Sequence, residues 1–320
     1  MRVLAILIMS ILLQVSMLAS TSRYYFPASA AGSSAGVVRL GMIEGMSEGA
    51  DSVFANPASL YRINQLSTSL FTTTFMDEVT YRNAAIALRF SFGTVGVGIM
   101  DLGVDDLEKT VKTDAGVDVD SYFNYKNSLL KLAYGFSQSE QVHFGLSGTY
   151  YFNKFDTVSA SAFNLDFGTV VKFDRLEFSF LVRNMLVSND VVFADTETGS
   201  NSSNGQTENL PLETVYSLKY AKGHFNLYGQ LKTIGSERAL QKHVALEFKP
   251  KFLPVLSLSA GMYQYSLLHY EEGELLDDQK LTASFGMTLN LRGVTFDYAY
   301  EKSEHIEFDH KHFFSAGFSF

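Results

Sequence analysis

The chain has no cysteine and no tryptophan among its 320 residues. The absence of cysteine excludes disulfide bonds and a lipoprotein anchor. Tryptophan often contributes to the aromatic girdles of membrane proteins. In this chain 27 Phe and 17 Tyr residues could form such girdles without it. The mean hydropathy of +0.04 resembles that of a soluble protein. It does not exclude a membrane barrel, because a barrel exposes only every second residue to lipid.

Basic residues are also scarce, with 25 Lys and Arg against 34 Asp and Glu, which gives a net charge of -9. This balance argues against nucleic acid as a partner. No nucleophile motif places serine, histidine and carboxylates together, so we predict no enzymatic activity and no cofactor. His310 and His312 would share a strand face, with His305 nearby, but a position at the barrel rim explains them better than a metal site.

The first twenty residues have the layout of a secretory signal peptide. Arg2 precedes an apolar stretch from Val3 to Leu13, and small residues follow up to Ser20. A membrane anchor would need about twenty apolar residues, and Gln14 and Ser16 interrupt this stretch early. We therefore predict that residues 1–20 are removed on export, with Ala28–Ala30 as a second, less favoured cleavage site.

Fourteen segments of the remaining chain have the composition of amphipathic strands. They are Leu66–Phe75, Tyr81–Phe90, Thr94–Leu102, Phe123–Phe136, Val142–Asn153, Ser159–Phe173, Leu176–Leu186, Leu212–Tyr220, His224–Thr233, Leu240–Phe248, Leu256–Leu267, Lys280–Leu291, Val294–Glu301 and Lys311–Phe320.

The connections between these segments alternate in length. Short turns such as Ser91–Gly93 and Arg292–Gly293 alternate with longer polar loops. Those loops are Gly103–Tyr122, Val187–Pro211, His269–Gln279 and Lys302–His310. A soluble β-sandwich has no reason to differ on its two sides, whereas an outer-membrane barrel has short periplasmic turns and long external loops. Residues 66–320 are therefore predicted to form a single transmembrane antiparallel up-and-down β-barrel of about fourteen strands in a bacterial outer membrane.

The strands alternate between apolar and polar residues, as expected for a wall with lipid outside and a polar lumen inside. Phe285 and Met287, for example, alternate with Ser284 and Gly286. The same alternation assigns charged side chains to the lumen. These are Lys131, Asp166, Glu177 and Arg183.

Residues 21–65 are poor in large apolar side chains, and we call them the hatch segment. Small residues let backbone pack closely, as a plug inside a narrow lumen requires. Within this segment Asn56, Pro57 and Ala58 predict the start of a short helix, because Asn is a good N-cap and Pro is favoured at the first helical position.

Taken together, these features resemble the FadL-like outer-membrane superfamily, and within it the PorV/PorQ family of Gram-negative bacteria. The resemblance is carried by Arg39–Met42 and Asp51–Leu60 ahead of fourteen strands, although Ser59 stands where the usual motif has glycine. It covers essentially the whole mature chain.

This resemblance implies two functions. FadL-like barrels carry hydrophobic molecules such as long-chain fatty acids, with a hatch in the lumen and a kinked third strand that opens toward lipid. PorV-like barrels instead serve type IX secretion and bind protein cargo or the translocon. In either role the expected partners include outer-membrane lipids and the barrel-assembly machinery, which receives an aromatic C-terminus such as Phe320.

Gly96 and Gly98 lie in the predicted third strand and would both face inward. Paired glycines permit a bulge or kink, which would fit a lateral opening. They would equally make room for the hatch segment, and the sequence leaves both interpretations open.

Overall fold

The computed structural model describes residues 28–75, 78–113, 116–186, 190–195, 207–235, 239–271, 274–302 and 310–320. The predicted signal peptide lies outside these residues. Among the described residues, no helix is both long and apolar enough to cross a bilayer.

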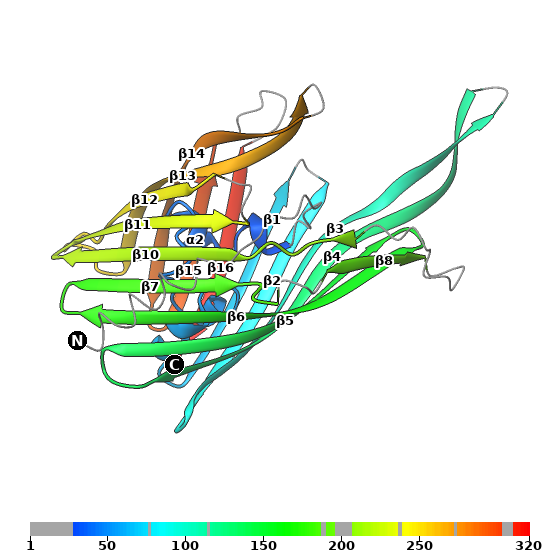
Figure 1. Cartoon of the computed structure of the whole chain (residues 1–320). Coiled ribbons are helices and arrows are strands. Elements are labelled where there is room, and N and C mark those ends of the chain that lie inside the picture. The colour runs from blue at the N-terminus through cyan, green and yellow to red at the C-terminus, as the bar shows by residue number, and fades with distance from the viewer. Residues whose placement is uncertain are drawn as a thin grey trace.

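Fourteen antiparallel strands pair in a closed ring, which confirms the predicted barrel (Figure 1). The ring closes where β1 pairs with β16 and where β5 pairs with β6. Its strands are β1 (Leu66–Phe75), β2 (Val79–Phe90), β3 (Gly93–Thr113), β4 (Gly116–Ser137), β5 (Val142–Phe155), β6 (Val158–Phe173), β7 (Leu176–Arg183), β10 (Glu213–Lys222), β11 (Phe225–Ile234), β12 (Gln241–Phe248), β13 (Leu256–Glu271), β14 (Glu274–Leu291), β15 (Val294–Glu301) and β16 (Lys311–Ser319).

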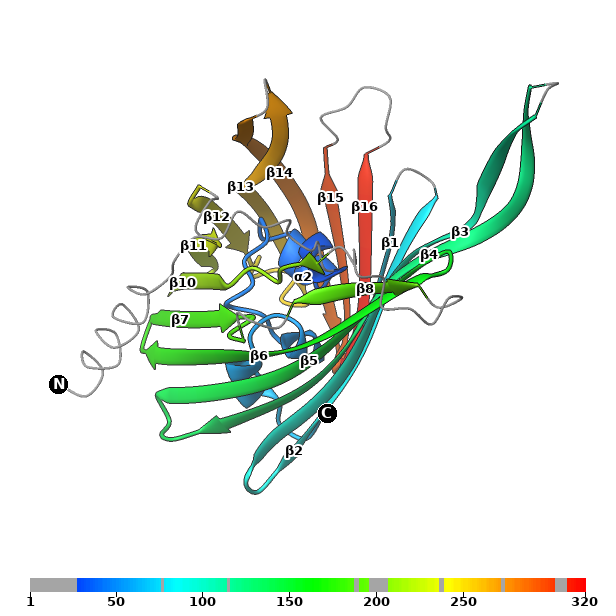
Figure 2. The ribbon, with the colours of Figure 1, turned by 45° about the vertical axis from the view of Figure 1, so that its right-hand side comes forward.

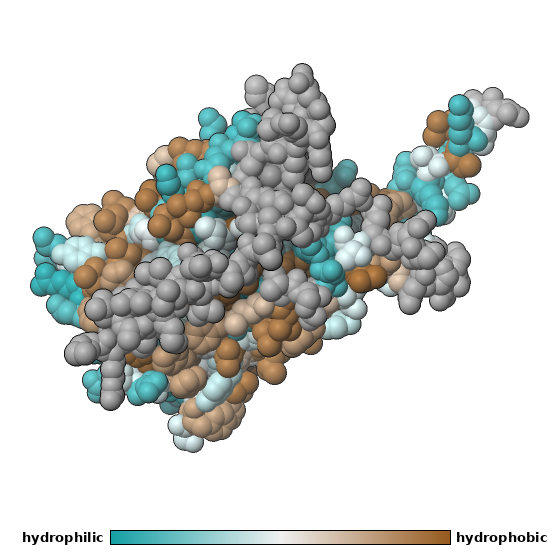
Figure 3. Space-filling view, viewed as in Figure 1, coloured by the Kyte–Doolittle hydropathy of each residue, from teal (hydrophilic) through white to brown (hydrophobic). Residues whose placement is uncertain are grey.

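Side chains alternate across the wall in the predicted register. Leu146 and Phe285 point outward and are 52% and 53% exposed, whereas Ser147 and Ser284 are buried on the inner side. Figure 3 shows hydrophobic side chains gathered over the flank of the barrel. An exposed apolar flank around a buried polar interior is the arrangement of a barrel wall that faces hydrocarbon.

Two of the predicted long loops are in fact strand. Residues 103–113 and 116–122 continue β3 and β4 as a pair of strands that projects far beyond the ring (Figure 2). Residues 269–271 and 274–279 likewise extend β13 and β14. The prediction was wrong here because acidic residues are common in loops, whereas Val117 and Val119 alternate with Asp118 and Asp120 as in a strand. The Val187–Pro211 connection contains two further short strands, β8 (Val191–Asp195) and β9 (Thr207–Glu208).

The described part of the hatch segment lies inside the ring (Figures 1 and 2). It contains the short α-helix α2 (Ala35–Val38) and the 3₁₀ helices η1 (Ala28–Ala31), η2 (Ala50–Val53) and η3 (Pro57–Arg62). Helix α2 packs on β14, β15 and β16, while η2 and η3 pack on β1 to β6. The segment therefore reaches inner faces on opposite sides of the barrel.

Inward-facing glycines of the wall make room for this segment. At each of seven positions an added Cβ would overlap the hatch segment: Gly96, Gly98, Gly135, Gly145, Gly168, Gly261 and Gly286. At Gly145 the neighbour is backbone, at Pro57 and Ala58, which cannot swing away. The wall thus follows the shape of the segment that it encloses.

Candidate functional site: the hatch segment and the inner wall

Asn56 begins η3, as the sequence predicts, and also ties this helix to the wall. Its side-chain oxygen accepts a hydrogen bond from the Ala58 amide at 3.0 Å, with Pro57 at the first helical position. Its amide nitrogen donates to Ser179 Oγ of β7 at 2.9 Å and to the Gly45 carbonyl at 3.3 Å. The residue is fully buried, so one side chain satisfies a helix cap and two further acceptors away from water.

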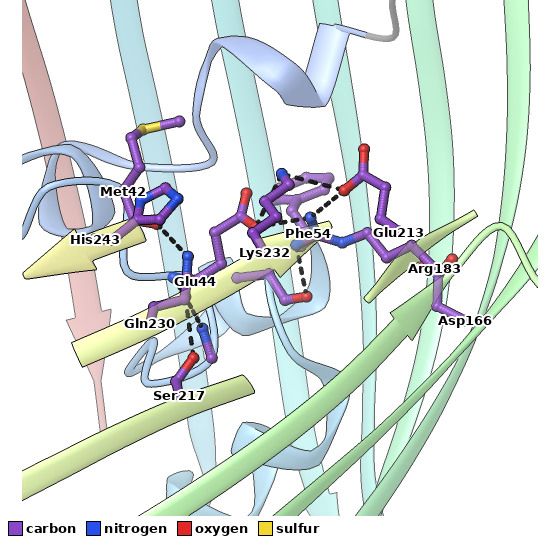
Figure 4. Close-up of polar contacts among 12 residues, drawn as sticks. Met42, Glu44, Phe54, Asp166, Arg183, Glu213, Ser217, Gln230, Lys232 and His243 are labelled. Atoms are coloured by element: carbon purple, nitrogen blue, oxygen red, sulfur yellow. Dashed lines mark hydrogen bonds and ion pairs between the residues drawn. The ribbon is translucent and has the colours of Figure 1, made fainter. Parts of the chain in front are cut away.

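A charged network joins the hatch segment to the wall at β7, β10 and β11 (Figure 4). Glu44 of the hatch segment contacts Arg183 Nη1 at 2.9 Å and Lys232 Nζ at 3.3 Å. Glu213 of the wall contacts the same two cations at 3.2 Å and 3.1 Å. Two acids thus face two bases, and all four side chains are at least nine-tenths buried.

The remaining predicted lumen residues also lie on the inner side. Lys131 Nζ contacts the Asp166 carboxylate at 2.6 Å, and Glu177 pairs with Arg62 of the hatch segment. Arg183 additionally donates to the Ala55 carbonyl at 3.1 Å. In this structure all four charged residues are buried, and two of them, Glu177 and Arg183, pair directly with the hatch segment, which the sequence did not show.

A second ion-paired anchor lies on the opposite side of the hatch segment. Arg39 contacts Glu247 of β12 at 3.0 Å and Asp297 of β15 at 3.4 Å. Nearby, the Asp51 carboxylate accepts a hydrogen bond from Ser34 Oγ at 2.6 Å. Buried polar contacts therefore fix the hatch segment to β7 and β11 on one side and to β12 and β15 on the other.

Two acids of the hatch segment have shifted pKa values of opposite sign. Burial raises the pKa of Asp51 from 3.8 to about 7, and the neighbouring charge of Asp297 adds to the effect. Burial also opposes ionisation of Glu44, but Arg183 and Lys232 together outweigh it and lower the pKa of Glu44 to about 2. The Glu44 carboxylate is thus ionised at neutral pH, whereas the Asp51 carboxylate titrates near neutral pH.

Large apolar side chains cover the inner wall at β1 to β4 and β16. They are Phe71, Tyr81, Met100, Leu129 and Phe313, each no more than 3% exposed. The Phe71 ring meets the Tyr81 ring edge-on at 5.4 Å between centroids. Hatch residues, among them Val38 and Phe54, complete the cluster. Because the lumen of a membrane barrel is normally polar, an inward apolar surface of this size is unusual.

On its other side the hatch segment borders a cavity of about 570 Å³. This cavity reaches the short-turn end of the barrel, since Asn64, Pro254 and Phe320 line it. Its walls combine apolar side chains with polar ones, and the polar ones include Ser34, Arg39, Asp51, Glu247 and Asp297. The hatch segment thus forms part of the wall of a cavity at this end of the barrel.

Gly96 and Gly98 sit where the hatch segment touches the wall. An added Cβ at these two glycines would overlap Val53 and Phe54, respectively. The β3 ladder runs through both glycines on either side, to Ala87 and Ala85 of β2 and to Ala133 and Lys131 of β4. In this structure the wall is therefore closed at the predicted opening, and the glycines accommodate the hatch segment.

The wall ladder is interrupted elsewhere, between β6 and β7. Pairing with β7 ends at Phe167, and β6 pairs again only from Ser161, now with β8. Side chains replace part of the missing ladder: Asn164 bonds the Leu186 amide and carbonyl at 2.9 Å and 3.2 Å, and Asp166 accepts from the Asn184 amide at 3.0 Å.

This interruption lies in the apolar outer belt. Phe163, Leu165 and Met185 point outward there and are 45%, 39% and 42% exposed. Backbone groups in hydrocarbon must be satisfied within the protein. One backbone hydrogen bond, from the Met185 amide to the Leu165 carbonyl at 2.9 Å, remains between the two chain segments here. A wall segment held by this bond and by carboxamide and carboxylate side chains is thus a local weak point of the ring.

The sequence contained a signal for the hatch contacts that the predictions did not use. All seven overlapping glycines fall at inward positions of otherwise regular strands, where glycine weakens a sheet unless something approaches closely. Arg39 and Glu44 carried no comparable signal, because their partners lie about two hundred residues away in sequence.

Neither a protein-family model nor a curated protein sequence matches this chain. Its structure is nevertheless similar to several solved barrels. The Pseudomonas putida toluene transporter TodX aligns with a TM-score of 0.58 at 10% identity, over 93% of this chain and 98% of that chain. A Pseudomonas aeruginosa FadL homologue gives 0.54 at 11%, over 94% and 100%. The Ralstonia pickettii toluene transporter TbuX gives 0.50 at 9%, over 94% and 99%.

Identities this low show a shared fold alone. The predicted likeness to FadL-like barrels is therefore supported as a fold, whereas the closer likeness to PorV/PorQ stays a prediction.

Proposed function

We propose that this protein is an outer-membrane channel for hydrophobic small molecules, closed in its resting state by the hatch segment. Export through a cleaved signal peptide and insertion by the barrel-assembly machinery are part of this proposal. The aromatic final strand, in which Phe314 and Phe318 face outward, is consistent with such insertion.

The apolar inner surface of β1 to β4 and β16 carries the proposal. A channel for water-soluble solutes has no use for Phe71, Met100 and Phe313 on its inner wall, since these side chains offer no hydrogen bonds. A hydrophobic solute gains about 25 cal/mol for each Å² of apolar surface that leaves water. Similarity in fold to a toluene transporter and to a FadL homologue supports the same substrate class.

In this proposal the hatch segment is a removable cover of the apolar surface. Phe54 and Val38 occupy part of the surface in the closed state and vacate it when the segment shifts. A barrel of eight strands is already filled by side chains, so a fourteen-stranded one without its hatch segment would hold water.

For the exit of the solute we propose the interrupted wall between β6 and β7. Asn184, with a positive φ of 56°, and Leu186 close the wall there through bonds to side chains of β6, and the Met185 amide adds one backbone bond to the Leu165 carbonyl. These few bonds can break one at a time. Cysteines introduced at Leu165 and Met185, in a chain with no native cysteine, test this route. Oxidation of the two cysteines to a disulfide should then reduce uptake of the solute, and reduction of the disulfide should restore it. Uptake that is the same with and without the disulfide would place the exit elsewhere.

The main experiment measures uptake of labelled toluene and of a labelled long-chain fatty acid by cells that express the protein. Met100→Gln puts an amide on the apolar inner surface, and we expect slower uptake of whichever probe is carried. Val244→Gln is the matched control, because Val244 is 54% exposed on the outer wall. If neither probe enters faster than in cells without the protein, the proposed substrate class is wrong.

Removal of residues 32–60 tests the hatch separately. We expect a higher ion conductance in planar bilayers and greater sensitivity of cells to bulky antibiotics. Unchanged conductance would contradict the proposed cover.

A second candidate function is a barrel of the type IX secretion kind that binds protein cargo or a translocon. The projecting β3–β4 hairpin favours it, because Val117, Val119 and Tyr122 are 69%, 45% and 62% exposed at its far end. Isolated two-stranded hairpins are marginally stable in water, so a protein partner would stabilise this one.

Copurification separates the two candidates. A hydrophobic molecule identified by mass spectrometry in the purified barrel favours transport. A protein partner at one-to-one stoichiometry that is lost when residues 105–123 are removed favours secretion.

A further inference from the structure

The outer wall carries an apolar groove of about 840 Å³ across β14, β15, β16, β1, β2 and β3. The groove follows a row of ladder partners in which small and large side chains alternate. Ala316 lies between Phe296 and Leu70, and Ala84 lies between Leu70 and Ile99. The two alanines leave a hollow between taller neighbours.

The groove is bounded at one end by an arginine. Arg82 points outward from β2, directly opposite Thr72 of β1 and Asp101 of β3. Asp101 accepts a hydrogen bond from Ser128, and no ion pair of Arg82 is present among the residues that the structure describes. The guanidinium is therefore an exposed cation beside an apolar surface.

The position of Arg82 corresponds to the edge of the lipid belt. The next two residues along its ladder row, beyond Thr72, are Phe314 and Tyr298, whose rings lie 5.4 Å apart. Rings of aromatic side chains mark the interface between hydrocarbon and water in membrane barrels. An arginine on the lipid face costs about 2–4 kcal/mol at the midplane but little near an interface, where anionic head groups are available.

We propose that this groove binds an anionic membrane lipid, with an acyl chain along Leu70, Ala84 and Ala316 and its phosphate on the Arg82 guanidinium. Arginine suits a phosphate because its planar N–H groups match two oxygens at once. The neighbouring Asp101 disfavours a carboxylate or phosphate on its own side, so the head group approaches from the Thr72 side. The inference rests on the proposed membrane location but not on what the lumen carries.

The test is native mass spectrometry of the protein released from nanodiscs of equal phosphatidylglycerol and phosphatidylcholine. We expect the wild type to retain phosphatidylglycerol about fivefold over phosphatidylcholine, as one arginine gains ~1 kcal/mol near an anionic lipid surface. Arg82→Gln should abolish this preference, whereas Asp101→Asn should increase it. Arg175→Gln, with the same charge change at a turn on the opposite end, is the matched control and should keep the preference.

A second variant fills the groove with a large side chain. Ala316→Phe should remove retained lipid of both kinds, because the ring occupies the place of the acyl chain. Equal retention of both lipids by the wild type, or a preference that survives Arg82→Gln, would overturn the proposal. A lipid-free dimer would do so too, because a second copy would then cover the groove. Failure to enter nanodiscs at all would count against the membrane location and thereby against the lipid site.

Discussion

The two halves of the inner wall hold the hatch segment by different means. On β1 to β4 and β16 an apolar cluster meets the hatch segment, with Phe71, Met100 and Phe313 around Phe54. Hydrogen bonds accompany this cluster, for example from Tyr81 to the Gly32 carbonyl and from Asn83 to the Ser33 carbonyl, but no ion pair joins the hatch segment to these strands among the described residues. On β7 and β10 to β12 the contact is polar, with Arg183, Lys232 and Gln230 against the hatch segment. Glu44 and Gly45 both donate their amides to Gln230 Oε1 on this side.

This difference has a mechanical consequence. Apolar contact is non-directional and tolerates sliding, whereas buried ion pairs and hydrogen bonds hold one position and cost free energy when displaced. Under the proposed function, the ion-paired half would be the fixed side of the hatch segment, and the half with the apolar cluster would be the side that opens to a hydrophobic solute.

Loss of Arg183 should be the most damaging single change to the polar half. Arg183→Met leaves Glu44 and Glu213 as buried anions with only Lys232 between them, and removal of one partner from such a network costs about 3–5 kcal/mol. We expect the hatch segment to leave its seat, so that trypsin cleaves at Arg39 and Arg62. A segment that stays resistant to trypsin would show that the apolar half alone is sufficient.

A wall glycine tests whether close approach is essential. Gly145→Leu places a side chain where the Pro57 and Ala58 backbone lies, and overpacking of this kind costs about 1–3 kcal/mol. Gly229→Leu is the control, since a Cβ added at this glycine of the outer wall would meet no atom within 4 Å. We expect higher conductance in planar bilayers for the first variant alone; equal conductance for both would argue that the segment can re-seat.

Substitutions of Asn56 distinguish its role as the cap of η3 from its role in anchoring the hatch segment to the wall. Asn56→Ala loses a cap worth about 0.5–2 kcal/mol together with its bonds to Ser179 and Gly45. Asn56→Asp keeps the oxygen that caps η3 but loses the two donated bonds. If the alanine variant leaks ions and the aspartate variant leaks nearly as much, the anchor matters more than the cap; a tight aspartate variant would reverse that ranking.

A last expected effect is a pH dependence that arises from Asp51. Its pKa in the seated state, about 7, lies above the ordinary value of 3.8, so protonated Asp51 favours seating. This contribution is complete below pH 3.8 and is lost as the pH rises through about 7. Conductance should therefore increase across neutral pH.

Asp51→Asn should remove that step, because the amide oxygen still accepts from Ser34 but does not ionise. Glu44 contributes nothing in this range, since its pKa of about 2 means that its contribution is lost only as the pH falls toward 2. A step that persists in Asp51→Asn would identify another titrating group.

The sequence alone determined the wall. Alternation at a period of two, together with short turns on one side, placed all fourteen strands and oriented residues such as Phe285 and Ser284 correctly. Such signals are local, since each strand carries its own pattern of lipid-facing and lumen-facing residues. The Asn56 cap was predictable for the same reason, because it depends on its immediate neighbours.

Only the tertiary structure decided how the lumen is filled. The pairing of Glu44 with Arg183, the contact of Phe54 with Gly98 and the break between β6 and β7 join residues far apart in sequence. No local pattern specifies such pairs, because ring closure alone decides which inward positions face the hatch segment. The two interpretations of Gly96 and Gly98 are distinguished in the same way. A small residue marks either a close approach or a kink, and only the position of Val53 and Phe54 shows that the wall contains a close approach here.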